Sequence, residues 1–157
     1  MTEQMAPLPA RKRIALIAHD ERKGDMLAWA RLNREALAQH DLYGTGTTGT
    51  LLAEALDLDV TAYMTGPLGG DQQVGTAIAQ GEIDVLIFFW DPLESHPHDP
   101  DVRALLRVAA LQNIPTADNR STADFLFSSP LMTQSYARQV YDYPARLARK
   151  RHIDLGT

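Results

Sequence analysis

The sequence predicts an α/β fold: a single doubly wound domain with a mainly parallel sheet flanked by helices. Strand and helix patterns alternate along the 157 residues and are joined by short loops. Residues 84–89 (DVLIFF) are apolar at consecutive positions, as expected for a strand with helices on both faces of its sheet. The length is typical of one domain, so we expect one unit over residues 1–157, with its core at about 11–130.

In the first half of the chain, residues 13–18 (RIALIA) predict a buried strand. A helix is expected next, with Asp20 as its N-cap and with Met26, Ala30 and Leu37 on one face. We expect the remaining elements of this half to be a strand at 41–43, a helix at about 50–55 and a strand at 60–64.

The second half continues the alternation. A helix is predicted from Asp71 to about residue 80, before the strand at 84–89. Asp99-Pro100-Asp101 opens a helix whose apolar positions follow helical spacing. The last predicted elements are a short strand at 115–117, a helix near 122–127 and an Arg-rich, partly helical tail at 138–157.

Composition excludes several classes of protein. The chain has no cysteine, which rules out disulfides, a thiol nucleophile and thiolate metal sites, and it fits a cytoplasmic location. Its apolar runs are too short for a signal peptide or a membrane span, which need about 7–15 and about 20 residues respectively. A net charge of −5 without a basic stripe argues against nucleic acid as a partner.

The polar residues that could carry chemistry share one location. His19-Asp20, the segment 44–49, the segment 66–71 and the segment 91–101 each follow a predicted strand. Because ligands of open parallel α/β sheets bind beyond the carboxyl ends of the strands, we expect these segments to form one site.

The segment GTGTTG at 44–49 is a candidate anion cradle. Glycines let backbone N–H groups approach a ligand, threonine hydroxyls add donors, and the next helix presents its positive end. An ordinary glycine-rich connection is an equally good interpretation of the letters alone. The segment matches neither the Walker pattern nor GxGxxG, so it does not indicate a nucleotide. Lys23 is either a solvated surface lysine or a point charge for the same phosphate.

Asp71 and the segment 91–101 admit structural and catalytic interpretations. On spacing alone, Asp71 is better explained as a helix N-cap than as a general base. Asp99 and Asp101 also suit the start of a helix, whereas His98 could polarise a carbonyl or carry a proton. No HExxH spacing supports a metal site, and we expect none.

Five stretches of the chain together resemble the methylglyoxal synthase family, and the likeness runs from about residue 11 to residue 130. They are IALIAHD at 14–20, GTGTTG at 44–49, GPLGGDQQVG at 66–75, DVLIFFWDPL at 84–93 and PHDPDVRALLR at 97–107. The resemblance implies a fold with flavodoxin-like layers and an enzyme that converts dihydroxyacetone phosphate into methylglyoxal and phosphate. It also implies a homohexamer, inhibition by inorganic phosphate and no cofactor.

The resemblance also implies roles for individual residues. Asp71 is implied as the catalytic base, while His98 binds substrate and assists proton movement, and His19 binds substrate as well. Active-site carboxylates are implied at Asp20, Asp91 and Asp101. The substrate's phosphate end is assigned to Lys23, Thr45, Gly46, Thr47, Thr48, Thr65 and Gly66. Family members commonly have Ser at the position of Thr65, which keeps the hydroxyl.

The tail departs from the family pattern. Lys150 stands where the family has an arginine thought to reach a neighbouring subunit's phosphate site. A lysine is a point charge and cannot make the bidentate contact of an arginine. Coupling between subunits is therefore less well supported than catalysis.

Two other classes of function stay open at this point. The same fold occurs in regulatory modules that bind an anion without reacting, and a flavodoxin-like electron carrier would have related layers. Retention of Asp71 and His98 favours catalysis. An aspartate is a weak base for a carbon acid, with a free pKa near 3.9, so donors must stabilise the enediolate as its charge develops.

Overall fold

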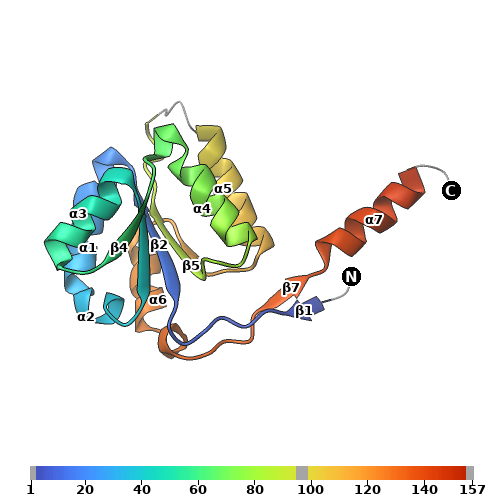
Figure 1. Cartoon of the computed structure of the whole chain (residues 1–157), viewed down its shortest axis with the longest axis horizontal. Helices are drawn as coiled ribbons and strands as arrows, with labels where there is room; N and C mark the ends of the chain where they lie inside the picture. Colours follow the sequence, from blue (N-terminus) through green and yellow to red (C-terminus); the bar gives the residue numbers. More distant parts are fainter. Residues whose placement is uncertain (1–2, 95–98, 155–157) are drawn as a thin grey trace.

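The structure is a computed structural model that describes residues 3–94 and 99–154. Its centre is a five-stranded sheet of order β4-β3-β2-β5-β6, in which all neighbouring strands are parallel (Figure 1). The strands of this sheet are β2 (Arg13–Ala18), β3 (Asp41–Thr45), β4 (Val60–Tyr63), β5 (Val85–Phe89) and β6 (Thr116–Ala117). The predicted doubly wound, mainly parallel α/β fold is confirmed.

Helices cover both faces of the sheet (Figure 1). One face packs against α1, α3 and α6 around the fully buried Trp29, and the other packs against α4 and α5. The helices are α1 (Lys23–Leu32), α2 (Arg34–Leu37), α3 (Gly46–Leu56), α4 (Gly70–Ala79), α5 (Asp99–Leu111), α6 (Arg120–Ser128) and α7 (Tyr143–Asp154). The described residues also include three 3-10 helices: η1 (Asp20–Arg22), η2 (Gly66–Leu68) and η3 (Pro130–Thr133).

The central strands are buried on both faces because their side chains alternate between two cores. Ile14, Leu16 and Ala18 of β2 point into one core, and Ala15 and Ile17 point into the other. The five residues of β5 are all buried, as their continuous apolar run predicted. This double burial fixes the register of β2 against β5, so their carboxyl ends finish side by side at Ala18 and Phe89.

The segment 44–49 is tighter than predicted. β3 continues through Thr45 and α3 begins at Gly46, whereas we expected a turn and a helix only from about residue 50. A Cβ on Gly44 would lie 2.6 Å from Gly49 Cα, so strand and helix touch through backbone alone. The glycines therefore shorten the connection and bring the amino end of α3 directly to the edge of the sheet.

Two predicted helix caps are wrong. Asp20 lies in the short turn η1, whose N-cap is His19, and its carboxylate accepts a hydrogen bond from Lys23 Nζ. The N-cap of α4 is Gly69, with a φ of 107°, and Asp71 lies inside the first turn of that helix. Neither aspartate stands at the N-cap position, and both line the pocket at the edge of the sheet.

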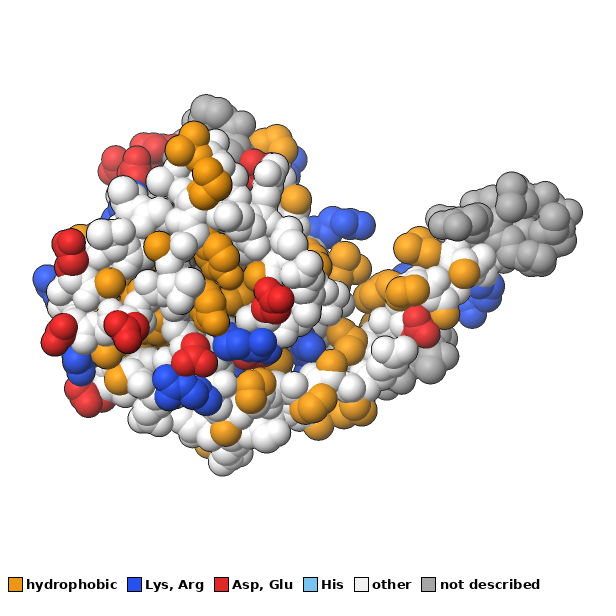
Figure 2. Space-filling model, viewed as in Figure 1, with side chains coloured by type: hydrophobic (Ala, Val, Ile, Leu, Met, Phe, Trp, Pro, Cys, Tyr) orange, Lys and Arg blue, Asp and Glu red, His pale blue; other side chains and the backbone are white. Residues whose placement is uncertain are grey.

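A second element, absent from the sequence prediction, is a two-stranded antiparallel ribbon of β1 (Glu3–Met5) and β7 (Gln139–Tyr141). With α7 it forms an arm that projects away from the sheet and carries exposed apolar side chains (Figures 1 and 2). Two buried cations hold the base of the arm. Lys12 Nζ donates to the carbonyls of Pro9 and Gln134, and Arg138 donates to those of Ala6 and Gln112.

Burial lowers the pKa of Lys12, and the nearby carboxylate of Asp84 partly offsets this effect. The immediate partners of its ammonium group at the base of the arm are the two backbone carbonyls.

Across residues 3–94 and 99–154, no helix combines the length and apolarity that crossing a bilayer requires.

Candidate active site

A pocket of about 260 Å³ opens at the carboxyl edge of the sheet, above β2, β3 and β4. Nine of the residues predicted for the site line it: His19, Asp20, Lys23, Thr45, Thr47, Thr48, Thr65, Gly66 and Asp71. They come from five separate segments between residues 19 and 71, and the parallel register of the strands brings these segments together. The remaining lining residues are Ile17, Ala18 and Pro67, which sequence reasoning did not single out.

The cation of the pocket is Lys23, the first residue of α1. Its Nζ donates to Asp20 Oδ1 at 2.6 Å and to Thr47 Oγ1 at 2.7 Å. The lysine thus spans the pocket rim from η1 to the start of α3. A positive charge at the start of a helix is unfavourable for the dipole of that helix, so the contacts to Asp20 and Thr47 account for its position better than α1 does.

The amino end of α3 supplies neutral donors. Gly46 has a φ of +36°, and a Cβ there would lie 2.7 Å from Thr65 Cα. Only glycine lets the segment 44–49 come this close to the loop that follows β4. The first turn of α3 therefore directs its unpaired backbone N–H groups and its positive dipole end toward the pocket.

Thr47 and Thr48 are adjacent but differ in environment. Thr47 is exposed at the rim, where its hydroxyl accepts from Lys23. Thr48 is 2% exposed, and its hydroxyl donates to the carbonyl of Ala18 at 3.4 Å. Thr48 therefore connects α3 to the end of β2, next to His19, while Thr47 faces the open part of the pocket.

Asp71 lies on the other side of the pocket and is 2% exposed. Two backbone features place it there. Gly70 N donates to Thr65 O at 2.9 Å, and a Cβ on Gly70 would lie 2.8 Å from the carbonyl carbon of Met64. Because α4 begins in contact with the end of β4, the carboxylate of its second residue is carried into the pocket.

His19 is 7% exposed and stacks edge-on against Phe88, with 5.2 Å between ring centroids. Its Nδ1 accepts a hydrogen bond from the backbone N–H of Asp91 at 3.1 Å. An Nδ1 that accepts carries no proton, so the neutral ring holds its proton on Nε2.

Asp91 itself is buried but does not line the pocket. Its Oδ1 accepts from the backbone N–H of Leu93 at 3.1 Å, which closes the turn after β5. The structure therefore places Asp91 behind His19, where it orients the imidazole.

The other two residues predicted from the segment after β5, Asp101 and His98, have different outcomes. Asp101 lies in the first turn of α5, half-buried, and accepts a hydrogen bond from Gln72 Nε2 at 3.1 Å. It is outside the lining of the 260 Å³ pocket. His98 falls outside the described residues.

Gln72 and Gln73 are contacts that sequence reasoning missed. Gln72 binds Asp101, and Gln73 Oε1 accepts from the backbone N–H of Met64 at 2.7 Å. Both side chains are exposed on α4 and have no unusual spacing. No local pattern could have identified them, because their partners lie on a different helix and at the end of a strand.

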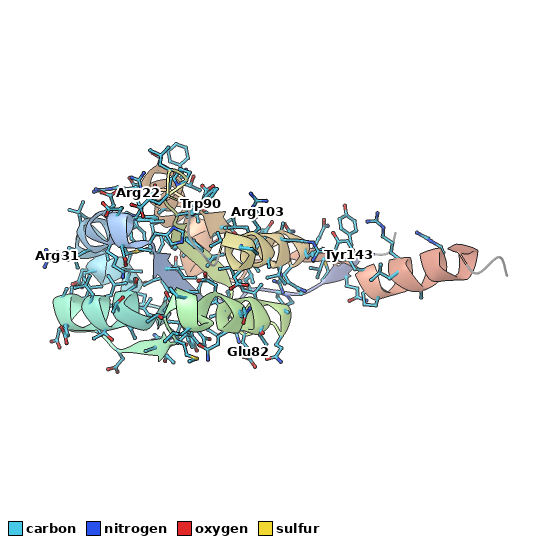
Figure 3. All side chains as sticks on the ribbon, turned by 90° about the horizontal axis from the view of Figure 1, so that it is seen from above. Arg22, Arg31, Glu82, Trp90, Arg103 and Tyr143 are labelled. Carbon is cyan, nitrogen blue, oxygen red and sulfur yellow. The ribbon has the colours of Figure 1, made fainter. Side chains whose placement is uncertain are left out.

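A second hollow of about 440 Å³ lies at the same edge of the sheet, over β5 and the start of α6. Its lining includes Arg22 and Trp90, which Figure 3 labels close together on the side of α1 away from α4. Arg22 also pairs with Asp25, another lining residue, at 3.4 Å. None of the residues predicted for the site lines this hollow.

Comparison with known proteins identifies the family. Residues 25–117 match the model of the MGS-like domain. The chain is 56% identical to a methylglyoxal synthase of Saccharophagus degradans, over 96% of this chain and 97% of that protein. It is 54% identical to a methylglyoxal synthase of Leptospira interrogans, over 90% of this chain and 96% of that one.

A solved structure agrees with these sequence matches. The crystal structure of a methylglyoxal synthase from Elizabethkingia anophelis NUHP1 superposes with a TM-score of 0.87 at 48% identity, covering 92% of this chain and 95% of that one. The match to the family model covers β3, β4, β5 and β6 and the pocket residues from Thr45 to Asp71. The chain belongs to the methylglyoxal synthase family.

Proposed function

We propose that this protein is a carbon-oxygen lyase that converts dihydroxyacetone phosphate into methylglyoxal and inorganic phosphate. The observation that carries the proposal is the composition of one pocket. A buried carboxylate, Asp71, and a phosphate-binding set around Lys23 and the first turn of α3 line the same 260 Å³ space. The relatives that match nearly the whole chain are named methylglyoxal synthase, which is an enzyme. This favours catalysis over a module that only binds an anion.

The first step is proton removal. Asp71 takes a proton from the hydroxymethyl carbon next to the carbonyl, and the electrons of that C–H bond form a C=C bond while the carbonyl oxygen becomes negative. The donor proposed for this oxygen is Nε2–H of His19, whose orientation the Asp91 backbone fixes. One donor aimed at a developing oxyanion contributes about 3 kcal/mol in comparable sites.

The second step expels phosphate. The hydroxyl on the former hydroxymethyl carbon passes its proton to the departing phosphate, and the electrons of its oxygen form the aldehyde C=O. The C=C bond of the enediolate shifts to lie between the central carbon and the phosphate-bearing carbon, and the C–O bond to phosphate breaks. The enolate that results takes up a proton on its terminal carbon to give methylglyoxal. Expulsion requires this C–O bond to lie parallel to the π orbitals of the enediolate, so the position of the phosphate selects elimination over isomerisation.

The phosphate position is assigned to the rim described above. Lys23, Thr45, Gly46, Thr47, Thr48, Thr65 and Gly66 surround one end of the pocket or shape it. Lys23 contributes a charge that offsets the dianion, and the amino end of α3 contributes backbone donors. Asp20 holds Lys23 through the 2.6 Å ion pair, so its role in this proposal is to place the cation.

The segment after β5 completes the proposal. Asp101 and His98 act at the substrate's carbonyl end, with His98 carrying protons. The bond from Gln72 to Asp101 supports this, because it ties the first turn of α5 to the helix that bears Asp71. Asp91 acts through His19.

Assembly, regulation and location follow from the same family membership. We propose one domain over residues 1–157, a homohexamer, inhibition by inorganic phosphate and a cytoplasmic location, where triose phosphates arise. The arm carries exposed apolar side chains on β1, β7 and α7, namely Met5, Tyr141 and Leu147, and a group of such side chains favours burial against another surface, which supports contact with another subunit. The Arg-rich tail containing Lys150 belongs to this arm.

The test mixes purified protein with dihydroxyacetone phosphate and measures methylglyoxal and phosphate together. The two products should appear in equal amounts. Asp71→Asn keeps the volume of the buried side chain but removes the base, so it should abolish both products while the thermal unfolding midpoint stays similar. Phosphate release without methylglyoxal, or full activity in Asp71→Asn, would contradict the proposed function.

A further inference from the structure

We propose that Gln73 is a positioning residue that holds the base and the phosphate-binding loop at a fixed separation. The proposal rests on the function proposed above and concerns the elimination step. Gln73 does not line the pocket. Its effect passes through the backbone bond that it makes to Met64.

The end of β4 leaves an unusual backbone donor. β4 is an edge strand of the sheet, and its last pair with β3 joins Thr45 to Tyr63. Beyond this pair the strand pairing ends, since α3 begins at Gly46. The N–H of Met64 is therefore the first donor past the ladder, and its partner is Gln73 Oε1 at 2.7 Å.

The bond joins two segments that carry opposite halves of the chemistry. Met64 directly precedes Thr65 and Gly66, which line the phosphate end of the pocket. Gln73 lies two residues after Asp71 on α4. The side chain of Gln73 thus connects the end of β4, just before the proposed phosphate-binding residues, to α4, the helix that bears the base.

A second closure lies just inside the first. Gly70 N and Leu68 N both donate to Thr65 O, at 2.9 and 3.0 Å. These bonds attach to the carbonyl of Thr65 and hold the loop side of that residue. The Gln73 bond attaches to Met64 N, on the strand side of Thr65, and so fixes the strand end to α4 as well.

The two chemical steps differ in their need for this rigidity. Proton removal requires only that Asp71 reach the hydroxymethyl carbon. Phosphate expulsion requires alignment of the C–O bond with the enediolate π orbitals, which depends on where the phosphate sits relative to the rest of the substrate. A loosened loop should therefore slow elimination and leave the enediolate more time to be reprotonated.

Two substitutions of Gln73 separate this role from general damage. Gln73→Met has a similar length but no acceptor, whereas Gln73→Glu keeps an oxygen acceptor for the Met64 N–H. The matched control is Gln80→Met, since Gln80 is an exposed glutamine at the carboxyl end of the same helix. Because Gln73 is exposed, its replacement should leave the fold intact.

The experiment runs the reaction in D₂O. It measures methylglyoxal formation together with deuterium incorporated into recovered dihydroxyacetone phosphate. In Gln73→Met, kcat for methylglyoxal should fall roughly ten- to hundredfold, the scale expected for misplacement of about 1 Å. The deuterium incorporated per methylglyoxal formed should rise at least about fivefold on the same grounds. Gln73→Glu should recover most of kcat, and Gln80→Met should match the unmodified protein.

Three results would overturn the inference: unchanged kinetics in Gln73→Met, an equal fall of exchange and elimination, or a Gln73→Glu variant as impaired as Gln73→Met. These are distinct from failure of the proposed function, which would appear as absence of methylglyoxal with the unmodified chain.

Discussion

The imidazole Nδ1 of His19 accepts a hydrogen bond from the backbone N–H of Asp91 at 3.1 Å. A backbone amide cannot give up its proton, so the bond persists only while Nδ1 keeps its lone pair. The neutral His19 therefore presents Nε2–H, and it acts as a hydrogen-bond donor and not as a base. In the proposed mechanism, Asp71 then takes the proton and the His19 ring stabilises the developing charge.

The first prediction concerns the protonation state of His19. ¹⁵N NMR of labelled protein at neutral pH should show an unprotonated Nδ1 and a protonated Nε2 for both His19 and His40, and His19→Gln should remove one of these two signal pairs. His40 is the internal reference, because its Nδ1 also accepts from a backbone N–H, that of Lys12. A doubly protonated His19 at neutral pH would rule out the donor role in its proposed form.

The second prediction concerns the charge at the phosphate end. Lys23→Met should raise KM for dihydroxyacetone phosphate by about ten- to hundredfold, because a hydrogen bond to a charged group contributes about 1.5–3 kcal/mol. Arg31→Met is the control, since it removes the same charge from the far end of α1, where Arg31 points away from the molecule (Figure 3). Equal effects of the two substitutions would show that only net charge matters.

The third prediction separates the two threonines of α3. Thr47→Val should impair phosphate expulsion more than proton exchange, because Thr47 faces the rim and contacts Lys23. Thr48→Val should also impair expulsion more than exchange, and it should lower the unfolding midpoint as well, because the Thr48 hydroxyl binds the carbonyl of Ala18. The measurement is the ratio of methylglyoxal to exchanged substrate, with urea unfolding alongside. Equal losses of both steps would count against the phosphate-positioning mechanism.

Particular residues show how much of the structure could be predicted from the sequence alone. The continuous apolar run at 85–89 predicted a central strand, because double burial leaves an unmistakable pattern in sequence. The shared edge was expected because the segments that hold the pocket residues follow predicted strands, and ligands of open parallel α/β sheets bind beyond the carboxyl ends of the strands. The caps at Asp20 and Asp71 were predicted wrongly because the prediction used side-chain propensity alone. The tertiary contacts that place these residues cannot be seen in the sequence.

The ribbon of β1 and β7 was missed for a related reason. Its three-residue strands are too short to display a period, and pairing Glu3 with Tyr141 depends on chain segments at opposite ends of the sequence. The role of Asp91 also needed geometry, since its contact to His19 runs through the backbone and carries no residue-specific signal.

The fourth prediction compares two glycines. Gly46→Ala should lose activity and roughly 1–2 kcal/mol of stability, since φ is +36° and the new Cβ would meet Thr65. Gly24→Ala should stabilise the protein by about 0.5–1 kcal/mol, because Gly24 lies in α1 with open space around it. Urea unfolding and steady-state kinetics measure both. A neutral Gly46→Ala would mean that the loop after β4 can retreat without cost.

The fifth prediction concerns pH and His40, which is 5% exposed. Burial lowers the pKa of His40 below its ordinary value of 6.5, and the positive charges of Lys12 and Arg11 lower it further, against a smaller opposing effect of Asp41. The unfolded chain therefore binds a proton more readily than the folded one. The stabilisation is complete above the unfolded pKa and is lost as the pH falls below it.

The measurement for His40 is the urea midpoint between about pH 7.5 and pH 5, within the range where histidine titrates. His40→Asn keeps an acceptor for the Lys12 N–H but cannot titrate, so its midpoint should fall less steeply with acid than that of the unmodified protein. Parallel curves for the two proteins would show that His40 is not the titrating group.

The ribbon of β1 and β7 has a consequence for how the molecule comes apart. It pairs residues near the two chain ends, yet neither strand belongs to the five-stranded sheet. The two strands of the ribbon can therefore separate while every strand of the parallel sheet keeps its neighbours. The pocket, whose walls come from residues 17–71, needs none of that seam to hold its shape. The ribbon of β1 and β7 is thus a peripheral element that can open locally while the sheet that carries the pocket stays folded.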